Sequence, residues 1–207
     1  MSEPRLTEIQ LDALRELANI ASGNAATALA QMLGTEVQLS VPRALALPRA
    51  EAVNACGSVN ERVAGVAIGL DGDIDGVMLL VIPRADADTL CTLLGVSPGS
   101  EVGESALREI GNILGAACLN ALSAITGLEL APCPPRLSTD ALGTIVALQV
   151  ARTVAPGGLA LVLDTVLHVA ELPCSISFLL LPANGAVSEL LAPLGLADDS
   201  MEPGDER

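Results

Sequence analysis

Two copies of one polar pair are the residues in this sequence best suited to chemistry. Glu16 precedes Asn19 by three positions, and Glu109 precedes Asn112 by the same spacing. The neutral amide of an asparagine both donates and accepts hydrogen bonds, so it can hold a water molecule. A Glu and an Asn without a metal, a histidine or a lysine nevertheless make a poor hydrolase by themselves. For a single copy, a solvated helix face would be the simpler explanation.

Each pair belongs to a longer pattern with the same spacing in both copies. A polar residue, Asp12 or Ser105, lies four positions before the Glu, and a proline, Pro42 or Pro135, follows the Asn after 22 residues. At about 100° per residue, the first three polar positions fall within a wedge of about 60° on a helix, so they share one face. A surface kept only for solubility has no reason to retain Glu and Asn twice. The duplication therefore favours a functional role.

The two patterns lie within an internal repeat of the chain. With an offset of 93 residues, Asp12 aligns with Ser105, and 12 of the 32 positions from 12 to 43 are identical without a gap. Duplication is the economical explanation. A polar, acidic end containing Gly and Pro is typical of disorder. The predicted organisation is a single domain at 1–196, composed of repeats at about 7–95 and 100–193, followed by an acidic disordered tail at 197–207.

The composition excludes several classes of protein. The chain has 207 residues and a formal net charge of −15, from 10 cationic and 25 acidic side chains, and every cation is an arginine. Without lysine the sequence has neither a Walker phosphate loop nor a Schiff-base nucleophile. The acidic balance and the single Phe178, with no Trp or Tyr, argue against nucleic-acid binding, which uses cations and stacked rings. A positively charged partner is easier to accommodate.

The cysteines and the amino terminus indicate a cytoplasmic protein. The five cysteines are widely spaced, without a CxxC pair or a Cys/His metal spacing, which favours reduced core thiols. The first residues lack the basic region and apolar block of a signal peptide. Two uncharged stretches of 19 residues, between Glu16 and Glu36 and between Glu109 and Glu129, approach the length of a membrane span. Both contain several polar residues, so we expect buried soluble helices and no membrane insertion.

A long helix is predicted at the start of the first half. Thr7 and Gln10 form a capping box, and apolar residues then recur at helical spacing. Gly34 provides the stop, so the helix spans about 7–33. The elements predicted after it are extended segments at about 36–46, 58–70 and 76–82, and a shorter helix at about 83–95.

The second half repeats this order. Ser100 opens a long helix that Gly127 closes. The alternation of helices and strand hairpins predicts an α+β fold of the α/β two-layer type. In this fold a pseudo-twofold repeat of long helix, antiparallel strands and short helix shares a mostly antiparallel sheet. The remaining elements of this half are predicted as strands near 128–133, 143–153, 159–168 and 174–181 and a short helix near 185–192.

Three other features have simpler structural explanations. The segment at 71–76, Asp-Gly-Asp-Ile-Asp-Gly, opens like a calcium loop, but its twelfth position is Ile82 instead of a bidentate Glu. A hairpin turn explains it better. His168 lies in an apolar strand without an adjacent nucleophile motif, so a strand-face histidine is favoured over a general base. The small residues at 22–26 indicate close helix packing. We therefore predict no metal site.

The duplicated pattern resembles the signature of a known family. The order Asp/Ser-x-x-x-Glu-x-x-Asn-x(22)-Pro is similar to the motif of the CheC/CheX/FliY phosphatases, which dephosphorylate the chemotaxis response regulator CheY. Both copies match at all four positions. Two motifs without an added carboxyl-terminal domain resemble CheC, since CheX carries one motif and FliY adds a flagellar-switch domain. The resemblance implies two related halves of helix and hairpin that share one sheet.

The resemblance also implies roles for the central residues. Asn19 and Asn112 would insert beside the aspartyl phosphate of CheY and align a water molecule for in-line attack. Glu16 and Glu109 would contact a lysine in the active site of the regulator. Phosphoryl transfer depends mainly on positioning and charge neutralisation. The protein then needs no cofactor of its own, because Mg²⁺ is expected in the active site of the phosphorylated partner.

The outer motif positions and the wider role of the protein stay open. Asp12 and Ser105 would lie at the edge of the site, where a direct role and a helix-surface role are equally expected. Pro42 and Pro135 are predicted to be structural, each ending an extended segment after its helix. The competing hypothesis is a non-catalytic protein, either a flagellar-switch component similar to the FliM middle domain or an adaptor for the receptor deamidase CheD. The retained Glu/Asn pairs favour the enzyme, and CheD binding can coexist with it.

Overall fold

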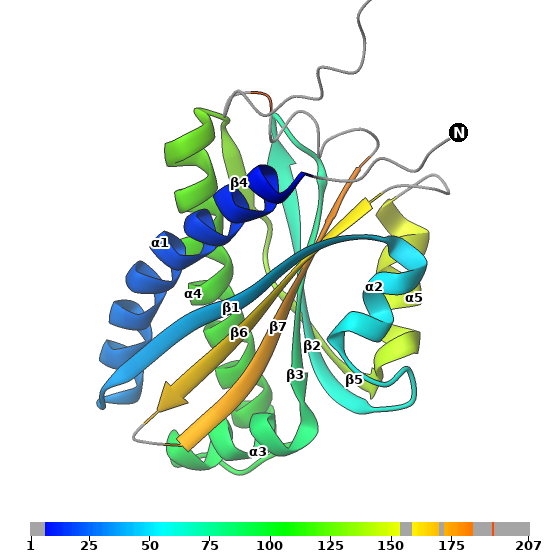
Figure 1. Cartoon of the computed structure of the whole chain (residues 1–207). Coiled ribbons are helices and arrows are strands. Elements are labelled where there is room, and N and C mark those ends of the chain that lie inside the picture. The colour runs from blue at the N-terminus through cyan, green and yellow to red at the C-terminus, as the bar shows by residue number, and fades with distance from the viewer. Residues whose placement is uncertain (1–6, 154–158, 170–171, 184–191, 193–207) are drawn as a thin grey trace, which may run out of the picture.

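An antiparallel sheet separates two groups of helices (Figure 1). The computed structural model describes residues 7–153, 159–169, 172–183 and 192, and within them the sheet has seven strands. In chain order the elements are α1 (Glu8–Leu33), β1 (Val37–Pro48), α2 (Arg49–Cys56), β2 (Arg62–Gly72), β3 (Gly76–Pro83), α3 (Arg84–Leu93), α4 (Glu101–Thr126), β4 (Leu130–Pro132), β5 (Arg136–Ala141), α5 (Leu142–Thr153), β6 (Leu159–Val169) and β7 (Leu172–Pro182). The strand order is β1-β6-β7-β3-β2-β4, and β5 also pairs with β2. The predicted mixed fold with an antiparallel sheet is confirmed.

The two long helices begin and end with the same local signals. Thr7 donates its backbone N–H to Gln10 Oε1 at 2.7 Å, and its Oγ1 accepts from the Gln10 N–H at 3.3 Å, which completes the predicted capping box. Ser100 Oγ accepts a backbone N–H from the first turn of α4 at 3.1 Å. Gly34 and Gly127 end the helices with φ of 66° and 73°, a conformation that glycine adopts without strain. Both predicted long helices are confirmed.

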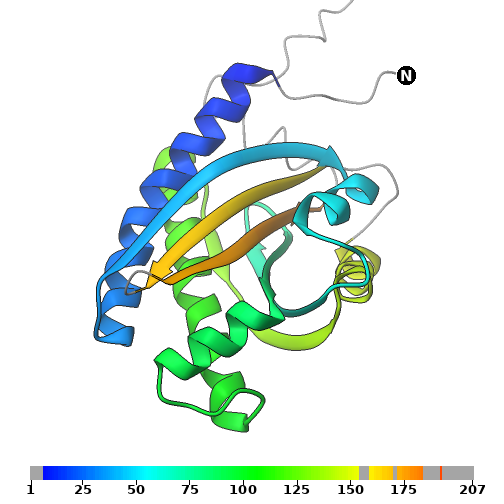
Figure 2. The ribbon, with the colours of Figure 1, turned by 60° about the horizontal axis from the view of Figure 1, so that its bottom comes forward.

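The larger hydrophobic core lies between the sheet and helices α1, α3 and α4, which cover the same face (Figure 2). Successive side chains of a strand point to opposite faces, so alternate residues reach this core. Ile68 of β2 and Met78 of β3 belong to it, together with Leu29 of α1 and Leu114 of α4. The two helices that carry the Glu/Asn pairs are therefore anchored on one side of the sheet.

A smaller core on the opposite face is covered by α2 and α5. Leu142, Ile145 and Val146 of α5 are spaced as one helical face, and each is at most 1% exposed. They pack in a cluster with strand residues such as Leu79 and Leu179. Helices therefore cover both faces of the sheet, where the sequence predicts only two layers.

The strand predicted at 143–153 is wrong, because this segment lies within α5. It is rich in β-branched residues, whose local preference is for strands. Burial of one helical face against the sheet outweighs that preference. The sequence also misses α2, which has only eight residues, and β5, which is mostly polar. Helices α2 and α5 form the layer that the sequence does not predict, and β5 pairs with β2 at one edge of the sheet.

The prolines of the repeated pattern lie where strand pairing is interrupted. β1 pairs with β6, and its register is irregular between Ser40 and Arg43, where Pro42 lies. Pro135 lies between β4 and β5, which both pair with β2. Proline has no N–H to donate to a strand ladder. Pro135 does follow the end of a strand, but the prediction that Pro42 ends one is wrong, since β1 continues to Pro48.

The β2–β3 hairpin and the position of His168 match their predictions. The two strands pair in register on either side of the turn at 73–75. Asp73 Oδ2 accepts the Glu129 backbone N–H at 2.8 Å, so this carboxylate holds the turn after α4. His168 is exposed on β6. Two predicted segments lie outside the described residues, namely the tail at 197–207 and, apart from Ala192, the short helix at 185–192.

Candidate functional site

The first Glu/Asn pair lies on the face of α1 that points away from the core. Leu14 and Ala18 are buried, at 4% and 6% exposure. Asp12, Glu16 and Asn19 are all exposed. At 100° per residue, these three polar positions lie on roughly the opposite side of the helix from the buried ones. The structure therefore brings the three predicted residues together on one solvent-facing surface.

The second pair occupies the matching surface of α4. Leu107 and Ile110 are buried in the core, while Ser105 and Glu109 are exposed and Asn112 is half-buried. A spacing of three residues separates Glu and Asn by about 4.5 Å along the helix axis and about 60° around it. An amide and a carboxylate at this separation can contact neighbouring groups of one partner molecule. Each long helix thus presents one such pair.

An arginine precedes each Asn by one turn, and the two arginines differ in their contacts. Arg15 Nη1 donates to Asp12 Oδ1 at 2.8 Å, an ion pair at the surface that contributes little to stability. Ser105 stands at the position equivalent to Asp12, and Arg108 makes no ion pair with any described residue. The two sites therefore share Glu and Asn but differ in local charge. The sequence signal for these arginines is their four-residue spacing from Asn, which is the same in both copies but is not part of the Glu/Asn pattern.

Glycines let α4 approach β2 closely beside the second pair. A Cβ added at Gly111 would lie 2.6 Å from Val66 Cγ1, and one added at Gly115 would overlap a side chain of the same strand. At the equivalent positions α1 carries Ala18 and Ser22, whose side chains are larger. The backbone of the helix that carries the second site is therefore held at a distance from the sheet that only glycine allows.

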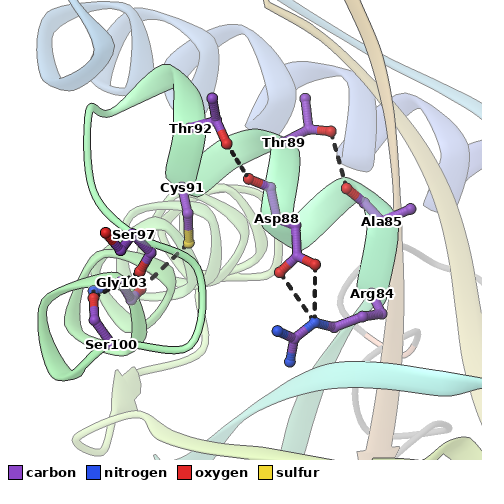
Figure 3. Close-up of polar contacts among 9 residues, drawn as sticks. All are labelled: Arg84, Ala85, Asp88, Thr89, Cys91, Thr92, Ser97, Ser100 and Gly103. Atoms are coloured by element: carbon purple, nitrogen blue, oxygen red, sulfur yellow. Dashed lines mark hydrogen bonds and ion pairs between the residues drawn. The ribbon is translucent and has the colours of Figure 1, made fainter.

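Contacts from α3 and the following loop hold the start of α4 (Figure 3). Cys91 Sγ donates to the Gly103 carbonyl at 3.8 Å. Ser100 Oγ donates to the Ser97 carbonyl at 2.6 Å while it caps the helix. A Cβ added at Gly103 would lie 2.6 Å from the same Ser97 carbonyl, so the chain packs tightly here. These contacts fix the first turn of α4, which leads directly into the second site.

Among the described residues, two small hollows lie beneath the two helices. Each has a volume of about 20 Å³, close to that of one water-sized probe, and the lining of the first includes Ala21, Ser22 and Cys118. Ser22 Oγ donates to the Ala18 carbonyl at 2.7 Å, and burial raises the pKa of the Cys118 thiol to about 12. Hollows of this size have no room for a substrate. The outer helix faces are the better candidate site.

Two further features concern metals and membranes. Among the described residues, no cluster of three or more His, Cys, Asp or Glu side chains is arranged to hold a metal ion. Helix α4 is long and apolar enough to cross a membrane by length and composition, and 56% of its apolar window is buried inside the protein. That burial is typical of a core helix, and it matches the contacts of α4 with β2.

Comparison with known proteins connects the fold and the paired sites to one family. The CheC-like family model matches residues 9–45 and 102–139, which include both Glu/Asn pairs. The CheY-P phosphatase CheC of Bacillus subtilis is 32% identical over 202 residues, covering 92% of this chain and 96% of that protein. The flagellar motor switch phosphatase FliY of the same organism is 27% identical over 139 residues, 64% of this chain and 36% of that protein. The chain belongs to the CheC-like family, as the resemblance predicts.

Solved structures share the fold at low sequence identity. FliY of Thermotoga maritima superposes with a TM-score of 0.76 at 19% identity, covering 93% of this chain and 99% of that chain. The FliM middle domain of Helicobacter pylori gives 0.70 at 12% identity, with 91% and 99% covered. CheX in a complex with CheY, BeF₃ and Mg²⁺ from Borrelia burgdorferi gives 0.50 at 17% identity, with 82% and 97% covered. The same architecture therefore occurs in proteins named FliY, FliM and CheX.

Proposed function

We propose that this protein is a cytoplasmic phosphatase that hydrolyses the aspartyl phosphate of a CheY-type response regulator at two sites. One observation carries the proposal: Glu and Asn occupy matching positions on the outer faces of both long helices, with Asn112 half-buried and the other three side chains exposed. The reaction is supported by the relative named CheY-P phosphatase CheC, which is 32% identical over 202 residues. The partner is supported by the structural neighbour CheX, which is seen in a complex with CheY.

Asn19 and Asn112 hold the attacking water in this proposal. The amide oxygen accepts a hydrogen bond from the water, and the amide N–H₂ donates to an oxygen of the water or of the phosphoryl group. The water oxygen forms a bond to phosphorus while the bond from phosphorus to the aspartate oxygen breaks. The products are the free carboxylate and inorganic phosphate. The protons of the attacking water pass to the phosphate and the solvent. Fixing the water in line is the contribution of this chain.

Glu16 and Glu109 dock the regulator. A carboxylate placed beside the phosphoryl group would repel it, so each Glu is expected to contact a cation of the partner, and a lysine ammonium suits that contact. The partner is also expected to bring its own Mg²⁺, which neutralises charge on the phosphoryl oxygens. Asp12 and Ser105 border these contacts and are proposed to tune them, because only Asp12 engages a neighbouring arginine.

A decay assay tests the proposal. A CheY-type regulator is phosphorylated, the phosphodonor is removed, and loss of phosphate is followed with and without this protein. We expect the intact protein to accelerate decay. Asn19→Ala should remove the part of this acceleration that comes from the first site, and Asn112→Ala the part that comes from the second. Asn24→Ala on α1 and Asn120→Ala on α4 are matched controls, since both side chains are exposed. Decay at the spontaneous rate in the presence of the intact protein would contradict the proposal.

A second candidate function is a non-catalytic adaptor for CheD or a component of the flagellar switch. The fold shared with the FliM middle domain and the relative named flagellar motor switch phosphatase FliY favour it. The double variant Asn19→Ala/Asn112→Ala separates the two functions. If the double variant supports normal chemotaxis in cells and still binds CheD or a switch protein, the adaptor explains the biology better. If chemotaxis fails while those contacts persist, catalysis is the essential role.

A further inference from the structure

Exposed aliphatic side chains flank the Glu of each site. On α1, Ile9 is 70% exposed and Ile20 is 47% exposed. On α4, Val102 is 63% exposed, and Ile113 is half-buried with part of its surface against the larger core. We name these two pairs the aliphatic stripes. They lie outside the motif that carries the proposed chemistry.

The stripes keep the same position relative to the Glu in both halves. One aliphatic residue lies seven positions before Glu16 or Glu109, and the other lies four positions after it. On a helix these offsets place the aliphatic residues within about 40° of the Glu and about 6–10 Å away along the axis. They lie on the side of the Glu away from the Asn. A molecule that docks on Glu16 can therefore also reach Ile20.

The exposure of these residues is unusual for this chain. Seven large hydrophobic side chains are exposed among the described residues, and three of them belong to the stripes. Single exposed aliphatic residues are common on protein surfaces and need no explanation. Here aliphatic residues recur at repeat-related positions, three of them exposed and Ile113 half-buried, beside a carboxylate and an amide that also recur. Packing within the core does not explain Ile9, Ile20 or Val102, because most of the surface of each faces solvent.

We infer that the aliphatic stripes dock the phosphorylated regulator by covering an apolar part of its surface beside the phosphorylation site. The inference rests on the proposed function, since the regulator is the molecule that must reach Asn19 or Asn112. A stable interface buries about 800 Å² on each partner, far more than one Glu and one Asn provide. Removal of the stripes from water supplies part of the missing contact. The Glu then fixes the orientation, and the stripe contributes affinity.

The occupant is the regulator and not a second copy of this chain. Both stripes follow the register of the Glu, which a surface for self-association would not require. A partner that brings a cation to Glu16 and an acyl phosphate to Asn19 meets Ile20 in the same approach. The complementary surface on the regulator is therefore apolar and lies next to its lysine.

Kinetics at one site at a time test this inference. Ile9→Ser and Ile20→Ser are made in an Asn112→Ala background, and Val102→Ser is made in an Asn19→Ala background. Each should raise the KM for the phosphorylated regulator by about five- to tenfold and leave kcat within about twofold, because contacts made equally in the ground and transition states affect KM. Ile125→Ser on α4, which is 38% exposed and lies off the stripes, is the matched control and should leave KM unchanged. Ile20→Leu should restore the lower KM.

A binding measurement keeps the inference testable apart from catalysis. The double Asn variant is titrated with the regulator activated by beryllofluoride and Mg²⁺, and Kd is compared with and without Ile20→Ser. We expect a weaker Kd for the Ser variant by about the same factor. Equal Kd and KM values in the stripe and control variants would overturn the inference. So would self-association in solution that the Ser substitutions abolish. Failure of the intact protein to accelerate decay would contradict the proposed phosphatase activity. The titration would then show by itself whether the aliphatic stripes bind the regulator.

Discussion

Asparagine and glutamate divide the proposed work at each site by the charge of their side chains. A neutral amide can lie beside a phosphoryl group and its attacking water without electrostatic repulsion. A carboxylate at the same place would be repelled, so it has to lie over a cation. The three-residue spacing on one helix provides both positions. In the proposed mechanism the partner supplies the complementary charges, a lysine for the Glu and Mg²⁺ for the phosphoryl group.

The charge of Glu16 and Glu109 should govern regulator affinity more than the chemical step. We expect Glu16→Gln in an Asn112→Ala background, or Glu109→Gln in an Asn19→Ala background, to raise KM by about tenfold, as loss of a charge-assisted contact does. Steady-state kinetics at low and high salt measure the effect. As salt is added, the affinity for the regulator should fall more steeply in the protein that keeps the Glu than in the Gln variant. An unchanged KM in both variants would show that the carboxylates do not dock the partner.

The cysteines provide a prediction that is independent of the partner. Burial raises the pKa of Cys118 to about 12, and burial followed by the charge of Asp86 raises the pKa of Cys174 to about 11. Thiolates are the reactive form, so at pH 8 an alkylating reagent should modify the exposed Cys133 first and spare Cys118 and Cys174. Mass spectrometry of the labelled protein measures the order. Rapid labelling of Cys118 in the folded protein would contradict the packing described for α1 and α4.

The same raised pKa values set a direction for stability at high pH. The folded protein keeps these thiols protonated, while the unfolded chain releases the protons near the ordinary value of 9.0. The folded state therefore binds more protons above that value, and the free energy of unfolding should fall as pH rises from about 9 towards 12. Chemical denaturation across this range measures the decline, and Cys118→Ala should make it shallower. A stability that rises over the same range would contradict this assignment.

At the scale of the elements, the two helices hold their sites by different packing. α4 lies tightly on β2 through glycines, and the loop after α3 fixes its first turn. α1 carries larger side chains at the equivalent positions and leaves a hollow of about 20 Å³ beside it. Because a helix is stiff, a shift of its backbone carries Glu and Asn with it. The distance between helix and sheet is therefore part of the geometry of each site.

One substitution made at two glycines should have opposite effects. Gly111→Ala places a Cβ against Val66 and should lower the free energy of unfolding by about 1–3 kcal/mol, as overpacking does. Gly23→Ala meets nothing within 4 Å on α1 and should raise it by about 0.5–1 kcal/mol through helix propensity. Urea denaturation measures both. Gly111→Ala in an Asn19→Ala background should also slow the second site. Equal stability of the two variants would contradict the close packing of α4.

Local signals in the sequence predict the long helices and fail at α5. The capping box at Thr7 and the glycine at position 34 act within a few residues, so they can be recognised without a tertiary structure. The identity of α5 is decided by burial of Leu142, Ile145 and Val146 on the far face of the sheet, a contact that local preferences do not contain. The mostly polar β5 is placed by its pairing with β2 and by Leu137, which packs against the larger core. Elements defined by distant partners are therefore the ones that the sequence leaves uncertain.

At the scale of the whole molecule, the strand order agrees with a duplicated chain. The order reads β1-β6-β7 on one side of the centre and β3-β2 on the other, with both β4 and β5 paired to β2 at the outer edge, so the two shorter strands together are the counterpart of β1. The bounds of α4 are those of α1 shifted by the sequence offset of 93 residues. Exchange of the outer strands between halves makes the sheet continuous. The two proposed sites are then copies of one site on a common scaffold.

The candidate site could be predicted from the sequence because its residues are close together in the chain. Glu16 and Asn19 lie one turn apart, and the helix that joins them is well signalled, so their shared face follows from helical geometry alone. The difference between Asp12 and Ser105 is visible in the sequence, and the ion pair of Arg15 with Asp12 has the spacing of neighbours on a helix. The partial burial of Asn112 could not be predicted in this way, because it depends on packing that only the structure shows.

The central claim is that the two asparagines carry the catalysis, and the most direct measurement is a single-turnover rate of dephosphorylation. The intact protein and the Asn19→Ala/Asn112→Ala variant are mixed in saturating amounts with a phosphorylated CheY-type regulator, and phosphate release is followed in time. Loss of the water-orienting groups should slow release by about 10²-fold or more, towards the spontaneous rate, while the regulator still binds. Equal rates for the intact protein and the double variant would contradict the account.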